Sequence, residues 1–310
     1  MNKLITIIGP TASGKTVLAA QLANNISGEI MSGDSRQVYR GMDIGTGKDL
    51  VDYTVDGNLI PYYIVDVVDA GTKYNVYEFQ QDFITSYNTI IAKKKQPILC
   101  GGTGMYIEAA LKGYTLIHVP SNQEFRAKCE TKTEAELIAE LKGFKELHNN
   151  TDIDNRRRMI RALEIEHYYA SNVEIKIEYP QFNPLIIGVS IDVETRRTRI
   201  DKRLQQRLEE GMIDEVKALI DRGVPTETLL YYGLEYKFIT MYLLNQLTYN
   251  EMVTQLNIAI HQFAKRQMTW FRGMERRGMK IHWIDGMKPM NERVHDCLGI
   301  INEYEMHQIV

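Results

Sequence analysis

Hydrophobic residues in the first third of the chain form short runs that are separated by longer amphipathic stretches. The apolar runs lie at residues 4–8, 29–32, 62–68 and 97–100, and each has the length of a buried strand. Stretches between them, such as residues 76–94, repeat apolar positions at helical spacing. Strands that alternate with helices predict βαβ units and a parallel sheet, whose ligands bind beyond the carboxyl ends of the strands.

The pattern changes after residue 115. Residues 124–147 are charged and helical without strand signals, and residues 155–169 form a second helical stretch that opens with three arginines. An apolar strand at 185–192 then rejoins the sheet, and residues 194–284 are mostly helical, with breaks at 223–225 and near Gly233 and a last short strand at 282–285. We therefore predict an α/β core at 1–115, a helical insertion domain at 116–183, and a return to the core with a mostly helical C-terminal part at 184–310.

The segment between the first strand and the first predicted helix, residues 17–26, has the spacing of a phosphate-binding loop. Residues 9–16 read GPTASGKT, which fits G-x-x-x-x-G-K-[ST]. In this context the loop amides and the helix N-terminus would surround an anion, Lys15 would reach a terminal phosphate, and the Thr16 hydroxyl would hold Mg²⁺. The residues expected to bind a diphosphate or nucleotide are Gly9, Pro10, Thr11, Ala12, Ser13, Gly14, Lys15 and Thr16. The fold class predicted is a P-loop NTPase-like parallel sheet.

Two further polar segments follow predicted strands. Residues 34–48 are rich in polar side chains and glycine, and Asp34 is placed to be a Mg²⁺ partner or a general base, or to cap a helix. Residues 101–104, GGTG, lead into a helix at 105–111 and form either a second anion-binding turn or a plain βα turn. Because parallel strands end at one edge, we expect the phosphate loop, Asp34, Asp66 and residues 101–104 to gather there.

Basic residues form two patches later in the chain. The first patch consists of residues 156–158 with Arg161, and the second runs from Lys265 to Arg277 and includes Trp270. Cations interleaved with aromatic rings suit single-stranded nucleic acid, where bases stack and phosphates pair. The alternative is a solvated charged face with core aromatics, and composition alone favours it.

Composition limits the other classes of function. The 310 residues are 44% hydrophobic and 25% charged with a net charge of −3, which is typical of a soluble globular protein and does not indicate a nucleic-acid binder. No apolar run reaches the roughly 18 residues that span a bilayer, and no signal-peptide pattern is present. Cys100, Cys129 and Cys297 lack metal-site spacing, as do the histidines. We expect a cytoplasmic monomer with reduced thiols and no contact with membranes.

Several segments, taken together and in order, resemble the tRNA dimethylallyltransferase (tRNA isopentenyltransferase) family. They are GPTASGKT at 9–16, DSRQVYRGMDIGTGK at 34–48, GGTGMY at 101–106, NRRRMIRALE at 155–164, RIDKRLQQRLEEGMIDEV at 199–216 and AKRQMTWFR at 264–272. The resemblance runs from residue 4 to about residue 272. It implies a P-loop α/β core with a helical insertion. It also implies transfer of a dimethylallyl group from dimethylallyl diphosphate to N6 of the adenosine 3′ of the anticodon, in tRNAs that read codons starting with U.

The resemblance also implies roles for single residues. Asp34 would be the general base at N6. Lys15, Thr103 and Arg203 would hold the diphosphate together with the loop and with Mg²⁺ on Thr16. The anticodon stem-loop of the tRNA would contact Asp34, Ser35, Arg36, Gln37, Thr103, Arg157, Arg158, Met159, Ile160, Arg161, Lys265, Arg266, Gln267 and Trp270.

The chain departs from the family pattern at three places, one of which is the insertion, where the family's usual acidic-proline signals are missing. Residues 235–238 read Glu-Tyr-Lys-Phe where the family usually has Gly-Tyr-Arg-Gln, and Ile260 and His261 stand where Thr-Arg is usual. Three other functions remain open at this point: a small-molecule kinase that uses the same loop and Mg²⁺, prenylation of a free adenine nucleotide, and an RNA-binding switch protein that only senses a nucleotide. The intact Asp34 and Thr103 argue against binding alone.

Overall fold

The computed structural model describes residues 2–114, 116, 118–144, 153–171 and 179–306. The chain divides into two compact units, one made of Met1–Tyr114 and Pro180–Val310 and the other of Thr115–Tyr179. Each unit has its own hydrophobic core.

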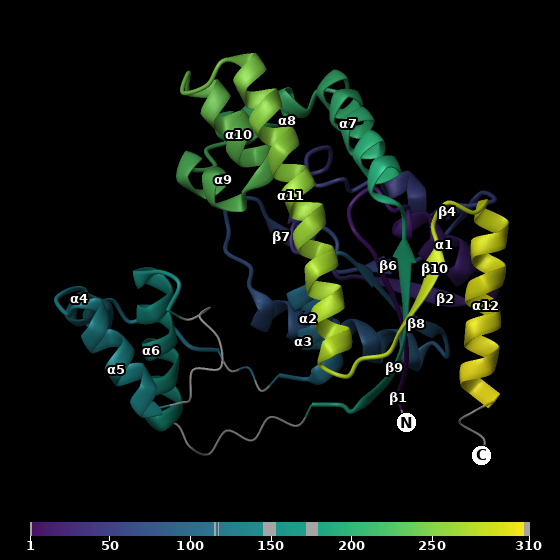
Figure 1. The fold of residues 1–310 in the computed structure, drawn as a ribbon, viewed down its shortest axis with the longest axis horizontal. Helices are drawn as coiled ribbons and strands as arrows, with labels where there is room; N and C mark the ends of the chain where they lie inside the picture. Colours follow the sequence, from purple (N-terminus) through teal and green to yellow (C-terminus); the bar gives the residue numbers. More distant parts are fainter. Residues whose placement is uncertain (1, 115, 117, 145–152, 172–178, 307–310) are drawn as a thin grey trace. The chain divides into compact units, whose positions relative to one another are not determined.

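A parallel sheet forms the centre of the first unit (Figure 1). Among the described residues its strand order is β10-β9-β1-β8-β2-β6. The strands are β1 (Asn2–Ile8), β2 (Gly28–Ser32), β6 (Tyr62–Tyr63), β8 (Gln96–Gly101), β9 (Phe182–Ser190) and β10 (Ile281–Asp285). β1 is buried from Leu4 to Ile8 because it has a neighbour on each side: Ile5 aligns with Ile98 and with Leu185. The predicted parallel α/β class is confirmed.

Helices cover both faces of this sheet (Figure 1). On one face, Ile5 and Ile7 belong to a core that also takes in side chains of α1 (Lys15–Ile26), η1 (Leu50–Tyr53) and α12 (Met290–Met306). On the other face lie α2 (Val76–Ala92) and α3 (Gly104–Lys112). The rings of Phe79 and Tyr106 stack between these two helices, with centroids 4.4 Å apart. The central strands β1, β8 and β2 are therefore shielded from water.

The predicted strand at 62–68 is wrong as a single element. The chain pairs with β2 only at Tyr62 and Tyr63, because Ile64 and Asp66 then adopt positive φ angles of 62° and 56°, which an extended strand does not allow. The remaining short strands are β3 (Tyr39–Arg40), β4 (Thr54–Val55), β5 (Asn58–Leu59) and β7 (Val68–Asp69); β3 pairs with β7 and β4 with β5.

A group of helices follows β9. They are α7 (Val193–Glu209), α8 (Met212–Asp221), α9 (Thr226–Tyr232), α10 (Leu234–Leu243) and α11 (Tyr249–Arg276). The predicted breaks are confirmed, since α8 ends just before Gly223 and Gly233 separates α9 from α10 with a φ of 78°. In Figure 1 the long helix α11 runs from this group back along the sheet.

The second unit consists of α4 (Gln123–Glu130), α5 (Glu134–Phe144) and α6 (Arg156–Ser171). The single helical stretch predicted at 124–147 is two helices, and its last residues, 145–147, lie outside the described residues. The core of this unit is formed by Cys129, Leu137, Leu141, Met159, Ile160, Ala162 and Leu163. In the part of the chain that the structure describes, no helix has the length and apolar character needed to cross a bilayer.

Candidate active site

The predicted phosphate loop connects β1 to α1 at the carboxyl edge of the sheet. Ala12 and Gly14 have positive φ angles of 61° and 77°, and Ser13 N–H donates to the carbonyl of Pro10 at 3.3 Å. Alternating backbone handedness of this kind lets successive amides converge on an anion. The Ser13 hydroxyl is buried without a hydrogen-bond partner in the described residues. The loop thus has the local geometry of an anion cradle.

A cavity of about 780 Å³ lies over this loop, entirely within the first unit. Polar residues from the loop and from the segment after β2 line one part of it, and α7, α10 and α11 line the rest. Of the predicted diphosphate and catalytic residues, it is lined by Thr11, Ala12, Gly14, Lys15, Thr16, Asp34 and Arg203. The structure therefore brings the candidate base and most candidate phosphate ligands into one space.

Asp34 and Lys15 face this cavity with different surroundings. Oδ1 of Asp34 accepts the Arg36 N–H at 2.9 Å, and its other oxygen has no hydrogen-bond partner among the described residues. Burial lowers the pKa of the Lys15 ammonium below its ordinary value, although the charges of Cys100 and Asp34 oppose this effect. A carboxylate fixed through one oxygen and open at the other is suited to accept a proton.

Thr103 and Gln267 tie the predicted turns together. The Thr103 hydroxyl accepts the Ser35 N–H at 3.0 Å and lies 3.3 Å from the Ser35 hydroxyl. From α11, the buried Gln267 accepts the Thr11 N–H at 2.8 Å and donates to the Gly102 carbonyl at 3.0 Å. Gln267 was expected to contact RNA, and the structure uses its amide to join the phosphate loop to the second glycine-rich turn.

Three arginines of α7 point to the same cavity. Arg199, Arg203 and Arg207 are four residues apart, which places them on one helix face, and all three line the cavity. Nη2 of Arg203 and of Arg207 lie 2.9 and 3.2 Å from Oδ2 of Asp49. Only Arg203 was expected here, although the spacing of the other two in the sequence already carried the signal. Asp49 had no such signal.

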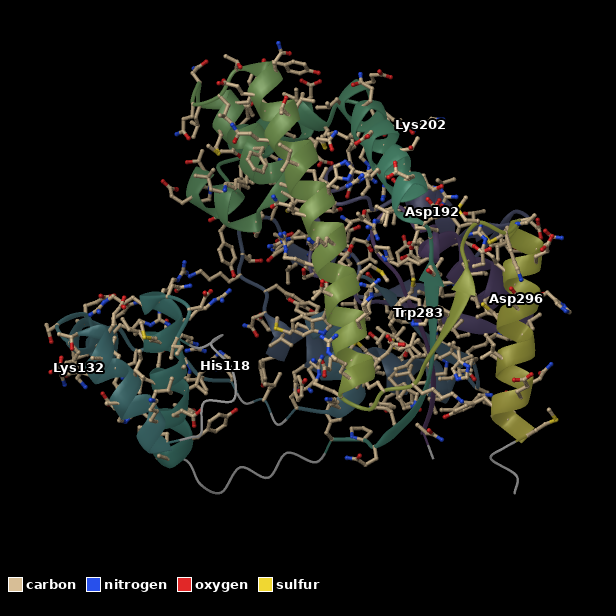
Figure 2. All side chains as sticks on the ribbon, viewed as in Figure 1. His118, Lys132, Asp192, Lys202, Trp283 and Asp296 are labelled. Carbon is tan, nitrogen blue, oxygen red and sulfur yellow. The ribbon has the colours of Figure 1, made fainter. Side chains whose placement is uncertain are left out.

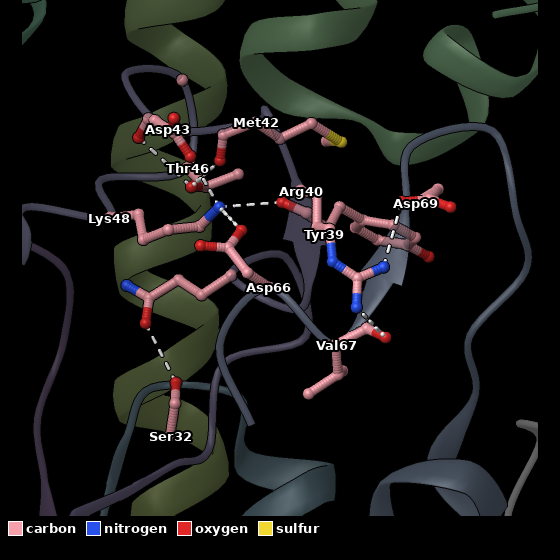
Figure 3. Close-up of polar contacts among 12 residues, drawn as sticks. Ser32, Tyr39, Arg40, Met42, Asp43, Thr46, Lys48, Asp66, Val67 and Asp69 are labelled. Carbon is pink, nitrogen blue, oxygen red and sulfur yellow. Dashed lines mark hydrogen bonds and ion pairs between the residues drawn. The ribbon is translucent and has the colours of Figure 1, made fainter. Parts of the chain in front are cut away.

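Residues 41–48, which we term the clamp loop, are held from within by Lys48 (Figure 3). The Lys48 side chain is fully buried, and Nζ donates to the Tyr39 carbonyl at 2.8 Å and pairs with Asp43 at 2.6 Å and with Asp66. Asp66 was expected at the phosphate loop, but it does not line the cavity. The turn forced by its positive φ directs the chain to Lys48 instead.

Glu215 of α8 holds the outer side of the clamp loop. Its Oε2 accepts the N–H groups of Asp43 and Ile44, each at 2.7 Å. Its Oε1 accepts the Gly45 N–H at 3.1 Å and the Tyr236 hydroxyl at 2.6 Å. One carboxylate therefore connects the clamp loop to α10 as well as to α8.

The clamp loop also fixes Gln37, a predicted tRNA contact. Its Oε1 accepts the Ser32 hydroxyl at 2.9 Å, and its Nε2 donates to the Gly47 carbonyl at 3.2 Å. Arg36 lies over the Tyr232 ring, 5.6 Å from the centroid. Ser35, Arg36 and Gln37 all line the cavity, so the segment after Asp34 is placed to border a ligand there.

Residues 235–238 and Ile260, where the chain departs from the family pattern, line the cavity. Glu235 stands at the start of α10, and burial raises its pKa to about 6 against the opposing effects of its own backbone N–H, Arg207 and Arg203. Ile260 lines the same wall from α11. His261 instead meets Asp201 at 2.8 Å, away from the wall. Glu235 is thus a further acid beside Asp34.

The predicted RNA contacts of α11 are divided between two environments. Lys265 and Arg266 are exposed, and Arg266 lines the cavity. Trp270 is 40% exposed, and its Nε1 donates to the buried Glu108 at 3.1 Å. Glu108 also binds Arg277, so this aromatic side chain is anchored to α3 by a buried carboxylate.

The five residues of the second unit that were expected to contact RNA lie in different environments. Arg157 and Arg158 are exposed on α6. Met159 and Ile160 are 1% and 4% exposed, so their side chains belong to the core rather than to an RNA surface. Arg161 pairs with Glu164 and donates to the Val119 carbonyl at 2.9 Å. Helical periodicity explains this split, since adjacent residues of a helix face different sides.

The cysteines and histidines form no site in the described ranges. No group of three or more His, Cys, Asp or Glu side chains is arranged there to hold a metal ion. Cys100, Cys129 and Cys297 are buried free thiols. Burial raises the pKa of Cys100 and Cys297 to about 12, which keeps both as unreactive thiols at neutral pH.

The Lys48 cluster predicts an asymmetric response to mutation. Lys48→Met leaves Asp43 and Asp66 without a cation, but these are 56% and 36% exposed and water can hydrate them. The double variant Asp43→Asn with Asp66→Asn strands a buried ammonium. We expect a loss of about 3–5 kcal/mol in the free energy of unfolding for the double variant and clearly less for Lys48→Met. Urea denaturation measures both, and equal losses would contradict this account.

Glu235 predicts a pH-dependent stability difference. Its folded-state pKa of about 6 lies above the ordinary value of 4.5, so ionisation costs more in the folded state and wild-type stability falls as the pH rises from 4.5 to 6. Glu235→Gln removes this cost. We expect the variant to be more stable by about 2 kcal/mol at pH 7.5 and to match wild type below pH 4.5. Thermal unfolding of both proteins across this pH range measures the difference in stability. A difference that does not change with pH would contradict this prediction.

Comparison with known proteins connects this geometry to a family. The sequence model described as IPP transferase matches residues 37–274. Proteins named tRNA dimethylallyltransferase 2 from Phocaeicola vulgatus and Bacteroides fragilis are each 58% identical, over 96% and 97% of this chain and 97% and 98% of their own. The crystal structure of full-length tRNA isopentenylpyrophosphate transferase from Bacillus halodurans is 30% identical, covers both chains completely and has a TM-score of 0.72. The chain belongs to the IPP transferase family, which confirms the resemblance found in its sequence.

Proposed function

We propose that the protein transfers a dimethylallyl group from dimethylallyl diphosphate to N6 of the adenosine 3′ of the anticodon, in tRNAs that read codons starting with U. Family membership and the names of the relatives support transfer of a prenyl group to tRNA. The observation that carries the proposal is that Asp34, the phosphate loop and Arg203 line one cavity. A base and a set of phosphate ligands in one space are what alkyl transfer from a diphosphate ester requires.

Asp34 acts as the general base in this proposal. The exocyclic amine of adenine is a weak nucleophile, so loss of its proton must accompany attack on C1 of the donor. The C1–O bond breaks as the N6–C1 bond forms, the electron pair leaves with the diphosphate, and the N6 proton goes to Asp34. The hydrogen bond from Arg36 N–H to Oδ1 orients the carboxylate and leaves its other oxygen for the amine. The target base must leave its stack to reach this point.

Charge builds up on the diphosphate as it leaves, and the phosphate loop, Lys15 and Arg203 stabilise it. Thr103 acts from the opposite side by holding Ser35 and thereby the segment that carries Asp34. The residues fit a magnesium ion, because Thr16 lines the cavity with a hydroxyl oxygen and the buried Ser13 hydroxyl of the same loop has no hydrogen-bond partner among the described residues. Mg²⁺ on Thr16 would neutralise part of the diphosphate charge.

The expected grip on the anticodon stem-loop rests on exposed residues of each unit separately. In the first unit Lys265, Arg266 and Trp270 are exposed on α11, and in the second unit Arg157 and Arg158 are exposed on α6. Aromatic and cationic side chains of this kind serve stacking and phosphate contacts. The oligomeric state and cellular location stay predictions.

Asp34→Asn tests the base. Asparagine can still accept the Arg36 N–H but cannot take a proton, so we expect turnover to fall by roughly 10²–10⁴ while binding of inorganic diphosphate stays within about threefold of wild type. The assay uses Mg²⁺, labelled dimethylallyl diphosphate and unmodified tRNA with an anticodon ending in A. Asp56→Asn, which removes an exposed carboxylate that is not part of the cavity lining, is the charge-matched control.

The molecule that receives the label distinguishes the remaining candidate functions. Label in the adenosine 3′ of the anticodon supports the proposal, whereas label in free AMP supports prenylation of an adenine nucleotide. Phosphate transfer from ATP without prenyl transfer would favour a kinase. Unchanged turnover in Asp34→Asn would remove this residue from the base role.

Arg157→Ala combined with Arg158→Ala tests the RNA grip of α6. Loss of two cations should weaken tRNA binding and reduce the slope of its logarithmic salt dependence by about 1 for each lost phosphate contact. Diphosphate binding should not change. Lys128→Ala, an exposed cation of the same unit that pairs with Glu124, is the control. A salt slope equal to that of wild type would place the grip elsewhere.

A further inference from the structure

A pair of arginines borders the phosphate loop outside the cluster around Asp49. Arg199 lies on α7 and lines the cavity. Arg293 lies in the first turn of α12, the last described helix. Nη1 of Arg293 is 3.3 Å from the position that a Cβ on Gly14 would occupy, so this guanidinium touches the loop where α1 begins.

Neither guanidinium has a counter-ion in the described part of the chain. Across the residues that the structure describes, no carboxylate oxygen forms an ion pair with Arg199 or Arg293 within 4 Å, and the buried Nε of Arg293 has no hydrogen-bond partner. Burial lowers the pKa of Arg293, and the charge of Arg199 lowers it further, while Cys297 and Asp285 act in the opposite direction. Two unneutralised cations held close together raise the free energy of the ligand-free protein, and a bound anion relieves this.

The arginines beside the phosphate loop indicate the class of anion. Arg203 and Arg207 share the carboxylate of Asp49, so that cluster carries a single net positive charge. Arg199 and Arg293 together carry two positive charges beside the same loop. A diphosphate carries several negative charges within a few ångströms, and the planar guanidinium matches two of its oxygens at once.

We propose that Arg199 and Arg293 form the second half of a diphosphate site and bind phosphoryl oxygens of the prenyl donor and of the diphosphate product. The assignment rests on the proposed function for the identity of the donor. It gives α12 a direct part in donor binding, although the segments that resemble the family end near residue 272. The helix therefore does more than cover the sheet.

Calorimetric titration of the full chain with inorganic diphosphate and Mg²⁺ tests the site. We expect Arg293→Ala and Arg199→Ala each to weaken binding about tenfold or more, as loss of a charge-assisted hydrogen bond predicts. The double variant should lose less than the product of the two, because both arginines hold one ligand. Arg293→Lys should retain more affinity than Arg293→Ala. Lys202→Ala, an exposed cation of the same helix α7, should bind as wild type does (Figure 2).

Two results would overturn the assignment: wild-type diphosphate affinity in a folded Arg293→Ala, or weakened tRNA binding with unchanged diphosphate binding, which would make this a site for an RNA phosphate. Arg293→Gln replaces the alanine variant if that variant fails to fold. The prenylation assay of the wild type separates the two proposals. If the wild type prenylates no tRNA but the arginine variants bind diphosphate more weakly, the proposed reaction is wrong and the anion site is supported. If the wild type prenylates tRNA and the arginine variants bind diphosphate as tightly as it does, only the anion site is wrong.

Discussion

The parallel pairing of β1, β8 and β2 is the constraint on which the candidate active site depends. Ile8 aligns with Gly101, and Ser32 aligns with Cys100, so the turns that follow these strands start at the same edge. The backbones there approach so closely that a Cβ on Gly101 would collide with the backbone of Gly33. Glycine is required at this point because the turn with Asp34 and the turn with Thr103 must meet.

Polar contacts hold the loops beside the cavity in place. Gln267 joins two turns, Lys48 holds the clamp loop from inside, and Glu215 holds it from outside. Glu215 satisfies three backbone N–H groups, Gln267 satisfies one N–H and one carbonyl, and Lys48 satisfies the Tyr39 carbonyl together with two carboxylates. Such contacts have defined directions, so they specify the position of a loop more narrowly than hydrophobic contact does.

The cavity keeps its charges unequally compensated. Asp49 neutralises part of the arginine face of α7, whereas Arg199 of the same face and Arg293 beside the phosphate loop form no ion pair within the described residues. Glu235 adds an acid whose pKa of about 6 lies close to neutrality. A site that binds a polyanion and also removes a proton needs this combination of free cations and at least one free carboxylate.

The sequence by itself determined the α/β class, the position of the phosphate loop and the family, because these depend on periodicity and on motifs within a few residues of each other. Tertiary structure alone decided which side chains could act. In the folded chain Met159 and Ile160 are buried, Asp66 pairs with Lys48, and Gln267 forms hydrogen bonds with two backbone groups. The tertiary structure also brings Arg293 to a loop nearly 280 residues earlier in the chain. Contacts between such distant residues leave no trace in local periodicity, since they arise only when the strands pair and the helices pack on them.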